Sequence, residues 1–335
     1  MNYIGSKHRL SSFISETIVN ISGEDLSQKT FCDLFAGTGV IGCIFKPIVK
    51  KVIANDIEYY SYVLIRNYIG NHSAISSKEL IEELNILKGS KGFVFEEYSQ
   101  GGTAGRNYFT LENGQKIDAV RSCIENWKIN NKISENQYYF LLASLLESAD
   151  KIANTASVYG AYLKDIKASA TNKMVIKPAV FQETEKNHEV YQQDSNQLIK
   201  NIEGDILYLD PPYNARQYGA NYHLLNTIAK YDTFVPKGKT GLPTYYKSDY
   251  CRKNEVLDTF TDLINKAQFQ YIFLSYNNEG LMSSEIIKKT MKRFGKYSFV
   301  IKNYQRFKAD KTENRNHKAI HTEEYLHILE KPIYH

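Results

Sequence analysis

The segment spanning residues 30–56 constrains the fold of this chain more than any other part of the sequence. It reads as a short apolar strand (30–35), the turn Ala36-Gly37-Thr38-Gly39, a helix from residue 40 and a second strand (51–56). Glycines directly after a parallel strand let the backbone approach a ligand at the carboxyl edge of a sheet. The segment therefore predicts the opening of a doubly wound α/β sheet.

Further apolar runs predict the rest of this sheet. Two buried strands are expected at 205–210 and 271–276, and a terminal hairpin is expected from 297–304 and 324–330. Apolar side chains recur at helical spacing in residues 7–20, 59–68 and 223–231.

The middle of the chain has a different character. Residues 97–115 are rich in Gly, Asn and Ser and predict a loop, and two helices are expected at 117–130 and 134–153. We therefore interpret residues 71–184 as a mainly helical insert, and residues 1–70 and 185–335 as one α/β domain.

Composition excludes several classes of protein. The chain has 335 residues, of which 42% are hydrophobic, so it can bury a sizeable core. No stretch approaches the roughly 18 apolar residues of a membrane helix, and the first residues carry no signal-peptide core, so we expect a cytoplasmic protein with no membrane partner. The four cysteines lack CxxC or Cys/His spacing, which favours reduced, packed thiols and predicts no metal site.

The glycine turn favours a nucleoside cofactor that carries no phosphate. Its spacing is not the GxGxxG of dinucleotide enzymes, and no lysine follows it as in a phosphate-binding loop. This suits S-adenosyl-L-methionine (AdoMet), which is cationic. Asp56, at the end of the next strand, can accept hydrogen bonds from the ribose hydroxyls. The alternatives are a plain strand-to-helix turn and, for Asp56, a helix cap.

The segment Asp210-Pro211-Pro212-Tyr213 indicates chemistry on an exocyclic amine. Two prolines stop the preceding strand and fix the backbone, so they hold the carboxylate, the Pro211 carbonyl and the tyrosine ring at the sheet edge. The amine of adenine is a poor nucleophile because its lone pair is delocalised. Two acceptors on its hydrogens direct this lone pair at a methyl sulfonium, while an aromatic ring stacks on a base that has left the duplex. The alternative is a proline-rich surface turn.

These motifs, in this order, resemble the Dam-like alpha group of DNA adenine-N6 methyltransferases, of the kind found in type II and type IIS restriction–modification systems. The resemblance rests on residues 3–7 (YIGSK), 33–39 (DLFAGTG) and 210–213 (DPPY), and it spans nearly the whole chain. It implies a Rossmann-like, AdoMet-dependent methyltransferase fold: a seven-stranded, mostly parallel sheet with a final antiparallel strand. Residues 71–184 then become the candidate target-recognition region of a catalytic domain formed by 1–70 and 185–335.

The resemblance also assigns roles to single residues. It implies that Asp210, Pro211, Pro212 and Tyr213 are catalytic. The cofactor-binding residues that it implies are Tyr3, Lys7, Asp33, Phe35, Gly37, Gly39, Asp56 and Asp194. Asp194 stands where the family has an acid that contacts the adenine of the cofactor, and a helix cap is the alternative for this residue.

A basic segment near the end of the chain favours an anionic partner. Residues 285–320 carry eleven Lys and Arg against three acidic residues, a local charge of +8 compared with +5 for the whole chain. Candidate contacts with double-stranded DNA are Asn214, Arg216, Lys239, Lys247, Arg306, Lys308 and Arg315. The alternative for each is a solvated surface. We expect the bases to be read by one of three regions, 71–184, 231–255 or 305–322.

Together these features predict a site-specific enzyme that transfers a methyl group from AdoMet to N6 of adenine in duplex DNA, with base flipping. The resemblance implies a modification enzyme that is a monomer or weak dimer, with a separately encoded restriction endonuclease as its partner. Three alternatives stay open: an RNA adenine methyltransferase, a catalytically silent AdoMet-sensing DNA-binding protein, and a cytosine-N4 methyltransferase, which usually has Ser in place of Asp210.

Overall fold

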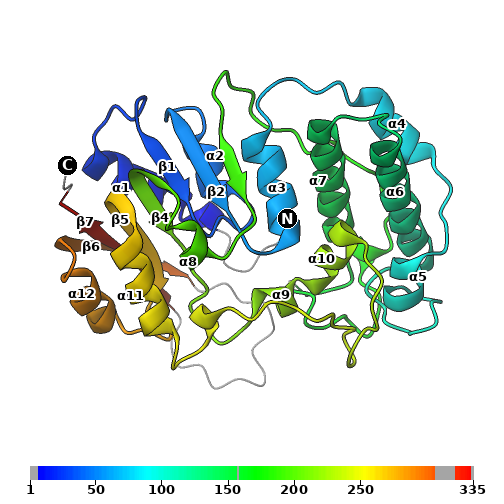
Figure 1. The fold of residues 1–335 in the computed structure, drawn as a ribbon. Coiled ribbons are helices and arrows are strands. Elements are labelled where there is room, and N and C mark those ends of the chain that lie inside the picture. Colours follow the sequence, from blue (N-terminus) through cyan, green and yellow to red (C-terminus); the bar gives the residue numbers. More distant parts are fainter. Residues whose placement is uncertain (1–6, 157, 306–320, 333–335) are drawn as a thin grey trace. The chain divides into compact units, whose positions relative to one another are not determined.

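The computed structural model describes residues 7–156, 158–305 and 321–332 (Figure 1). The chain divides into two compact units. Within the described part of the chain, the sheet unit comprises residues 7–57, 184–217, 247–305 and 321–332, and the helical unit comprises residues 58–156, 158–183 and 218–246. Besides most of the insert expected from the sequence, the helical unit therefore contains residues 58–70 and 218–246.

A seven-stranded sheet is the centre of the sheet unit as far as the chain is described. Its strands are β1 (Thr30–Asp33), β2 (Lys51–Asn55), β3 (Glu189–Tyr191), β4 (Glu203–Leu209), β5 (Gln268–Asn277), β6 (Lys296–Gln305) and β7 (His321–Glu330). Their spatial order is β3-β2-β1-β4-β5-β7-β6. β7 pairs antiparallel with β5 and β6, and the other pairs are parallel. The predicted mostly parallel sheet with a final antiparallel strand is confirmed.

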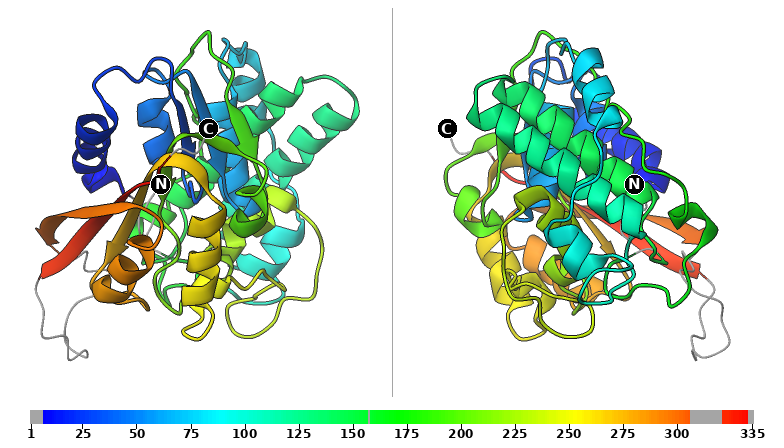
Figure 2. Two further views of the ribbon diagram at one scale, coloured as in Figure 1. Left: turned by 60° about the vertical axis from the view of Figure 1, so that its left-hand side comes forward. Right: turned by 90° about the vertical axis from the view of Figure 1, so that its right-hand side faces the viewer.

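Helices cover both faces of this sheet (Figures 1 and 2). On one face lie α1 (Ser11–Ser22) and α2 (Val40–Phe45), and the ring of Phe45 stacks on Phe31 of β1 with centroids 4.1 Å apart. The other face carries α8 (Ser195–Leu198), α11 (Val256–Lys266) and α12 (Ser284–Met291). Their apolar side chains form one buried cluster with residues of β1, β4 and β5. Alternation along each strand therefore decides which side chains face α1 and α2 and which face α11 and α12.

The predicted strands at 30–35, 51–56, 205–210 and 271–276 and the terminal hairpin are confirmed as β1, β2, β4, β5 and β6–β7. The sequence analysis did not predict β3, α8, α11 or α12. β3 has three residues, all half-buried, so neither its length nor an alternation of burial marks it as a strand.

The helical unit contains the remaining described helices. They are α3 (Tyr59–Ile65), a π-helical turn (Arg66–Gly70), α4 (Lys78–Ile86), α5 (Phe93–Tyr98), α6 (Leu111–Ile129), α7 (Glu135–Lys151), α9 (Tyr218–Asn221) and α10 (His223–Lys230). The two long predicted helices are confirmed as α6 and α7, which run side by side (Figure 2). Among the described residues, no helix combines the length and the apolar character that a membrane span requires.

The loop predicted at 97–115 is wrong at both ends. α5 includes the first two residues of this range, and α6 already starts at residue 111, where the Thr110 side chain accepts a hydrogen bond from the Asn113 amide. The first turns of α6 lack an apolar signal because their buried side chains are polar. Asn113 is 2% exposed and donates to two backbone carbonyls that follow α7. Apolar periodicity does not mark a turn that is buried through hydrogen bonds.

Three buried charged side chains of α6 satisfy the ends of neighbouring helices. Lys116 Nζ donates to three carbonyl oxygens at the end of α4, at 2.7, 2.9 and 2.7 Å. The Asp118 carboxylate accepts two amides of the first turn of α5, at 3.0 and 2.7 Å. Arg121 donates to the last carbonyls of α10. The terminal amides and carbonyls of a helix have no hydrogen-bond partner within that helix. These side chains of α6 supply the missing partners and so cap the neighbouring helices.

We expect Lys116→Met to destabilise the protein by about 2–3 kcal/mol, because it leaves buried carbonyls of α4 without a donor. Urea unfolding of the full chain measures the change. Lys78→Met is the matched control, since Lys78 is an exposed residue of the same helix α4. Equal stability of the two variants would contradict the capping role of Lys116.

Candidate functional site

The glycine turn after β1 is a tight bend held by the end of β2. Gly37 and Gly39 adopt left-handed φ angles of +54° and +80°, a conformation that favours glycine. The Gly37 amide donates to the Asp56 carboxylate at 2.8 Å. Asp56 is not the cap of α3, whose N-cap residue is Glu58. The structure thus gives Asp56 the role of holding the bend, and its contact with the ribose stays a prediction.

Asp33, the last residue of β1, leaves one carboxylate oxygen unpaired just before this bend. Its Oδ2 accepts the Gly42 amide at 3.1 Å. Its Oδ1 has no hydrogen-bond partner among the described residues, although Asp33 is only 1% exposed. Burial raises the pKa of Asp33 to about 8; the Gly42 amide opposes the rise, and Asp210 and Asp56 add to it. A buried carboxylate with an unsatisfied oxygen marks a place suited to a donor or a cation.

Asn55 joins three strand ends, and the sequence analysis did not single it out. Its Nδ2 donates to the carbonyls of Leu34 and Gln193, both at 3.1 Å, and its Oδ1 accepts the Gln193 amide at 3.0 Å. The side chain thereby connects the end of β2 with the residues that follow β1 and β3. A lone Asn before Asp56 was its only sequence signal.

Asp194 is the N-cap of α8, and its Oδ1 accepts the Gln197 amide at 3.1 Å. It follows β3, which pairs in parallel with β2, so it lies at the same edge of the sheet as Asp56. The structure shows the helix cap. The contact with a cofactor stays a prediction.

The double-proline corner continues β4 into a fixed turn. Pro211 is buried, and the carbonyl of Tyr213 accepts the Leu281 amide at 2.8 Å. The Tyr213 ring meets the ring of Tyr276 edge-on, with centroids 6.1 Å apart and planes at 73°. Because Tyr276 is a buried residue of β5, the corner is held by the strand next to β4 and by the loop that follows it.

The glycine bend and the proline corner leave adjacent strands. β1 and β4 are parallel neighbours in which Asp33 lies opposite Tyr208, and the Leu34 amide donates to the Tyr208 carbonyl at 3.2 Å. Parallel strands end at the same edge, so the bend and Asp210 lie beside each other. The arrangement on which the sequence hypothesis depends, bend and corner at one edge of the sheet, is therefore present.

Lys7 is buried between two acidic side chains. Its Nζ lies 3.1 Å from Asp210 Oδ1 and 2.8 Å from Glu324 Oε1. Ser275 Oγ, from β5, donates to the same oxygen of Glu324 at 2.6 Å. Lys7 and Asp210 were both predicted site residues, whereas Glu324 was not.

The pKa values of these groups reflect burial and mutual attraction. Burial raises the pKa of Asp210 to about 6; the Lys7 ammonium opposes the rise and the Glu324 carboxylate adds to it. Burial lowers the pKa of Lys7, but the charges of Asp210 and Glu324 outweigh this and hold it well above its usual value. Lys7 is therefore a permanent cation, and Asp210 is ionised at neutral pH and above.

The other predicted residues are placed as follows. Phe35 meets Tyr250 edge-on, with centroids 5.2 Å apart, within the sheet unit. Asn214 Oδ1 accepts the Arg216 amide at 2.9 Å in a local turn, and the side chains of Arg216 and Lys247 are exposed. Lys239 is an exposed residue of the helical unit. The predicted residues Tyr3, Arg306, Lys308 and Arg315 lie outside the described residues.

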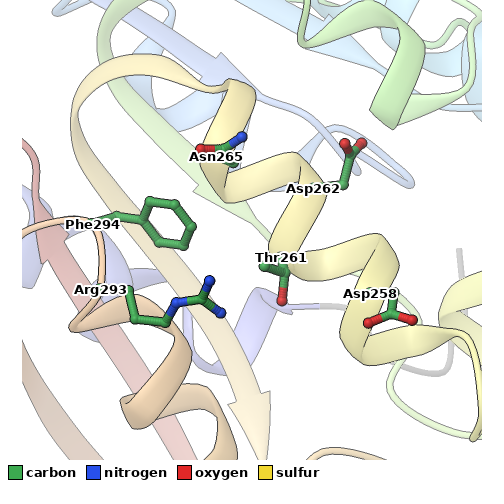
Figure 3. Close-up of a pocket in the computed structure, with 6 residues that line it drawn as sticks. All are labelled: Asp258, Thr261, Asp262, Asn265, Arg293 and Phe294. Atoms are coloured by element: carbon green, nitrogen blue, oxygen red, sulfur yellow. The ribbon is translucent and has the colours of Figure 1, made fainter.

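A surface pocket of about 340 Å³ lies elsewhere in the sheet unit (Figure 3). Four of its residues come from α11, and two follow α12; they are Asp258, Thr261, Asp262, Asn265, Arg293 and Phe294. Asp262 is already engaged by Lys266 and by the amide of Asn196. No residue predicted to bind cofactor or to act in catalysis lines this pocket.

Residues 3–293 match the family model of the D12 class N6 adenine-specific DNA methyltransferases. The chain is also similar to the type II methyltransferase M.NlaIII of Neisseria lactamica, with 61% identity over 332 residues that cover 99% of each chain.

Two more distant relatives carry similar names. The type II methyltransferase M.CviAII of Paramecium bursaria Chlorella virus 1 is 39% identical over 98% of each chain. The type II methyltransferase M.FokI of Planomicrobium okeanokoites is 38% identical over 99% of this chain, which covers 53% of that longer protein.

We expect Asp33→Asn to stabilise the ligand-free protein at pH 8 relative to the wild type, by an amount on the order of 1–3 kcal/mol. The folded pKa of Asp33 is raised to about 8, so wild-type stability falls as pH rises from about 4 to about 8, because the folded state retains a proton that the unfolded state releases. The Asn variant lacks this loss.

Urea unfolding at several pH values in this window measures the effect. Asp258→Asn, a change at an exposed residue of α11, is the control and should follow the wild type at every pH. A constant difference between Asp33→Asn and the wild type across the window argues against a buried, proton-retaining carboxyl.

Proposed function

Because this chain belongs to the D12 class N6 adenine-specific DNA methyltransferase family, we propose that it transfers a methyl group from AdoMet to the N6 amine of adenine in duplex DNA. The observation that carries this proposal is the placement of the glycine bend and the Asp210 corner at one edge of the sheet, on hydrogen-bonded neighbouring strands. A methyl donor held at the bend and an amine held at the corner then meet in one place.

The charges at this edge fit AdoMet, which carries a sulfonium and an ammonium group but no phosphate. Asp56, Asp210 and Glu324 contribute three carboxylates, Lys7 contributes one ammonium, and Asp33 adds a buried carboxyl group. The unpaired, buried Oδ1 of Asp33 can accept a hydrogen bond from a cationic donor, which lowers the pKa of this carboxyl toward its usual range. When bound, AdoMet supplies an electrophilic methyl group.

Asp56 is proposed to bind the ribose of the cofactor. A carboxylate has lone pairs enough to accept a hydroxyl while it retains the Gly37 amide. The backbone of the glycine bend and the side chains of the proposed set complete the cofactor site. The remaining members of this set are Tyr3, Lys7, Phe35, Gly37, Gly39 and Asp194.

Asp210 is proposed to orient the target amine. Lys7 pairs with its Oδ1 at 3.1 Å, which leaves Oδ2 to accept one hydrogen of the amine. The Pro211 carbonyl accepts the other hydrogen. With both hydrogens held, the nitrogen lone pair leaves conjugation with the ring and points at the methyl donor. Pro212 keeps the corner rigid, and Tyr213 stacks on the base after it has flipped out of the duplex.

Exposed basic residues near the corner are proposed to contact DNA phosphates. The segments that carry Arg216 and Lys247 are joined by two hydrogen bonds between Gln217 and Ser248, so these two cations belong to one surface. The further proposed contacts are Asn214, Lys239, Arg306, Lys308 and Arg315. Base reading is proposed for one of the regions 71–184, 231–255 and 305–322.

The relatives support a role in restriction–modification. M.NlaIII and M.CviAII are named type II methyltransferases and match nearly the full length of this chain. We therefore propose a modification enzyme that acts as a monomer or weak dimer beside a separately encoded restriction endonuclease.

A methyl-transfer assay tests the function. The protein is incubated with tritiated AdoMet and either duplex DNA or RNA of the same sequence, and the product is digested to nucleosides. We expect label in DNA, as N6-methyladenine. Label in RNA alone supports the RNA alternative, N4-methylcytosine supports the cytosine alternative, and AdoMet-dependent DNA binding without product supports the silent sensor.

We expect Asp210→Ala and Asp56→Ala to separate catalysis from cofactor binding. Asp210→Ala should lower kcat by at least about 100-fold while the Kd for AdoMet changes little, because this carboxylate acts on the amine. Asp56→Ala should weaken AdoMet binding by roughly 10- to 100-fold, because the loss of hydrogen bonds to a charged group costs a binding free energy of this size. Calorimetry and single-turnover kinetics measure the two effects, and turnover near the wild-type rate in Asp210→Ala is the contrary result.

A further inference from the structure

We propose that Glu324 is a positioning residue for methyl transfer: it draws the Lys7 ammonium onto one oxygen of Asp210 and so keeps the other oxygen available to the target amine. This inference rests on the proposed function, because it concerns how Asp210 is kept ready for an amine. It rests on three side chains from distant parts of the chain.

The geometry shows an ammonium shared between two acids. Lys7 Nζ lies 2.8 Å from Glu324 Oε1 and 3.1 Å from Asp210 Oδ1, so the shorter contact is with Glu324. Glu324 and Ser275 are 2% and 0% exposed, and the Ser275 hydroxyl donates to the same Oε1 at 2.6 Å. The carboxylate of Glu324 is therefore fixed by two donors, one of them on the neighbouring strand.

The sheet determines where this carboxylate lies. Glu324 belongs to β7, an interior strand, and its Cα is paired with Asn277 of β5 and with Lys302 of β6. Its backbone is therefore held on both sides. Glu324 lies at the same end of the sheet as Asp210, which follows β4, because β7 is antiparallel to β5 and β5 is parallel to β4.

The stability of the fold does not require Glu324 as a second acidic partner of Lys7. A Lys7–Asp210 pair is already neutral, and burying another carboxylate carries a desolvation cost of several kcal/mol before its bonds are counted. A lone ammonium facing Asp210 can bridge both carboxylate oxygens, since it has three donors and no fixed direction. It would then compete with the amine for Oδ2. Sharing the ammonium with Glu324 prevents this competition.

The titratable groups around Lys7 and Asp210 come from five elements. Lys7 comes from the 3₁₀ turn Lys7–Arg9, Asp33 from β1, Tyr208 from β4, Tyr213 from the corner, and Glu324 from β7. Apart from burial, which is the largest effect, Lys7 lowers the pKa of Asp210 and Glu324 raises it. Removing Glu324 or removing Lys7 must therefore move the ionisation of Asp210 in opposite directions.

Glu324→Gln tests the role of this charge, since it keeps the shape and an acceptor oxygen. The measurements are kcat/KM for duplex DNA as a function of pH, which reports the ionisation of the enzyme before DNA binds, and kcat at the pH plateau. The acid limb of the wild type should have its midpoint near the pKa of Asp210, about 6. In Glu324→Gln we expect this midpoint to move to lower pH by about one unit, with a plateau kcat about 10-fold lower because Lys7 moves onto Asp210. In Lys7→Met we expect the acid limb to move to higher pH.

Glu330→Gln is the matched control, because Glu330 lies on the same strand but its side chain is 44% exposed, with a 3.5 Å ion pair to Lys296. Its pH profile should coincide with that of the wild type. Ser275→Ala is a second variant for the case that Glu324→Gln does not fold. It removes one donor from Glu324 Oε1 without changing any charge, so we expect a few-fold loss of kcat with the acid limb unmoved.

The outcomes separate the two proposals. A purely structural Glu324 predicts lower stability with an unchanged pH profile, and that result overturns the inference while leaving the proposed function intact. An unchanged kcat in Ser275→Ala also overturns it. A wild-type protein that transfers no methyl group to DNA overturns the proposed function, and the inference with it.

Discussion

The parallel pairing of β1 with β4 is the constraint on which the proposed site depends. It sets Asp33 opposite Tyr208, so that the turns after both strands start from the same edge. A register shift of one residue would turn the side chains of β4 to the other face and carry Asp210 away from Lys7. Leu207 and Leu209 oppose such a shift, because they are buried in the cluster that β4 shares with α11 and α12. The packing of these two leucines in the core therefore fixes the position of Asp210 at the carboxyl edge of the sheet.

The two units use buried charge in opposite ways. In the helical unit, Lys116, Asp118 and Arg121 each have hydrogen-bond partners at the end of a neighbouring helix, so their buried charges are satisfied. At the edge of the sheet, Asp33 keeps an unpaired oxygen. An unsatisfied buried carboxyl group destabilises a fold, and its position beside the glycine bend supports the proposed site for a cationic cofactor.

Local features of this site could be predicted from the sequence, and long-range ones could not. The glycine bend and the proline corner are each defined by a few consecutive residues, and their strands could be ordered by the rules of parallel sheets. Glu324 lies 317 residues from Lys7, and its neighbour Glu323 looks the same in the sequence. Only the register of β7 shows that one of the two is buried against Lys7 while the other accepts the Tyr325 hydroxyl. The role of Asn55 could not be predicted for the same reason, since its hydrogen-bond partners follow two other strands.

The direction of β7 explains how the far end of the chain reaches this place. In a parallel strand, the residues at the carboxyl edge are the last ones, which run directly into a loop. β7 runs antiparallel to β5, so its first residues lie at that edge and its last residues lie at the opposite edge. Glu324 is paired with Asn277 in the first part of the strand. A side chain from a paired, interior stretch of strand thus stands among residues that come from strand ends and loops. Its backbone is held on both sides by the sheet, so β7 fixes the carboxylate that contacts the lysine paired with Asp210.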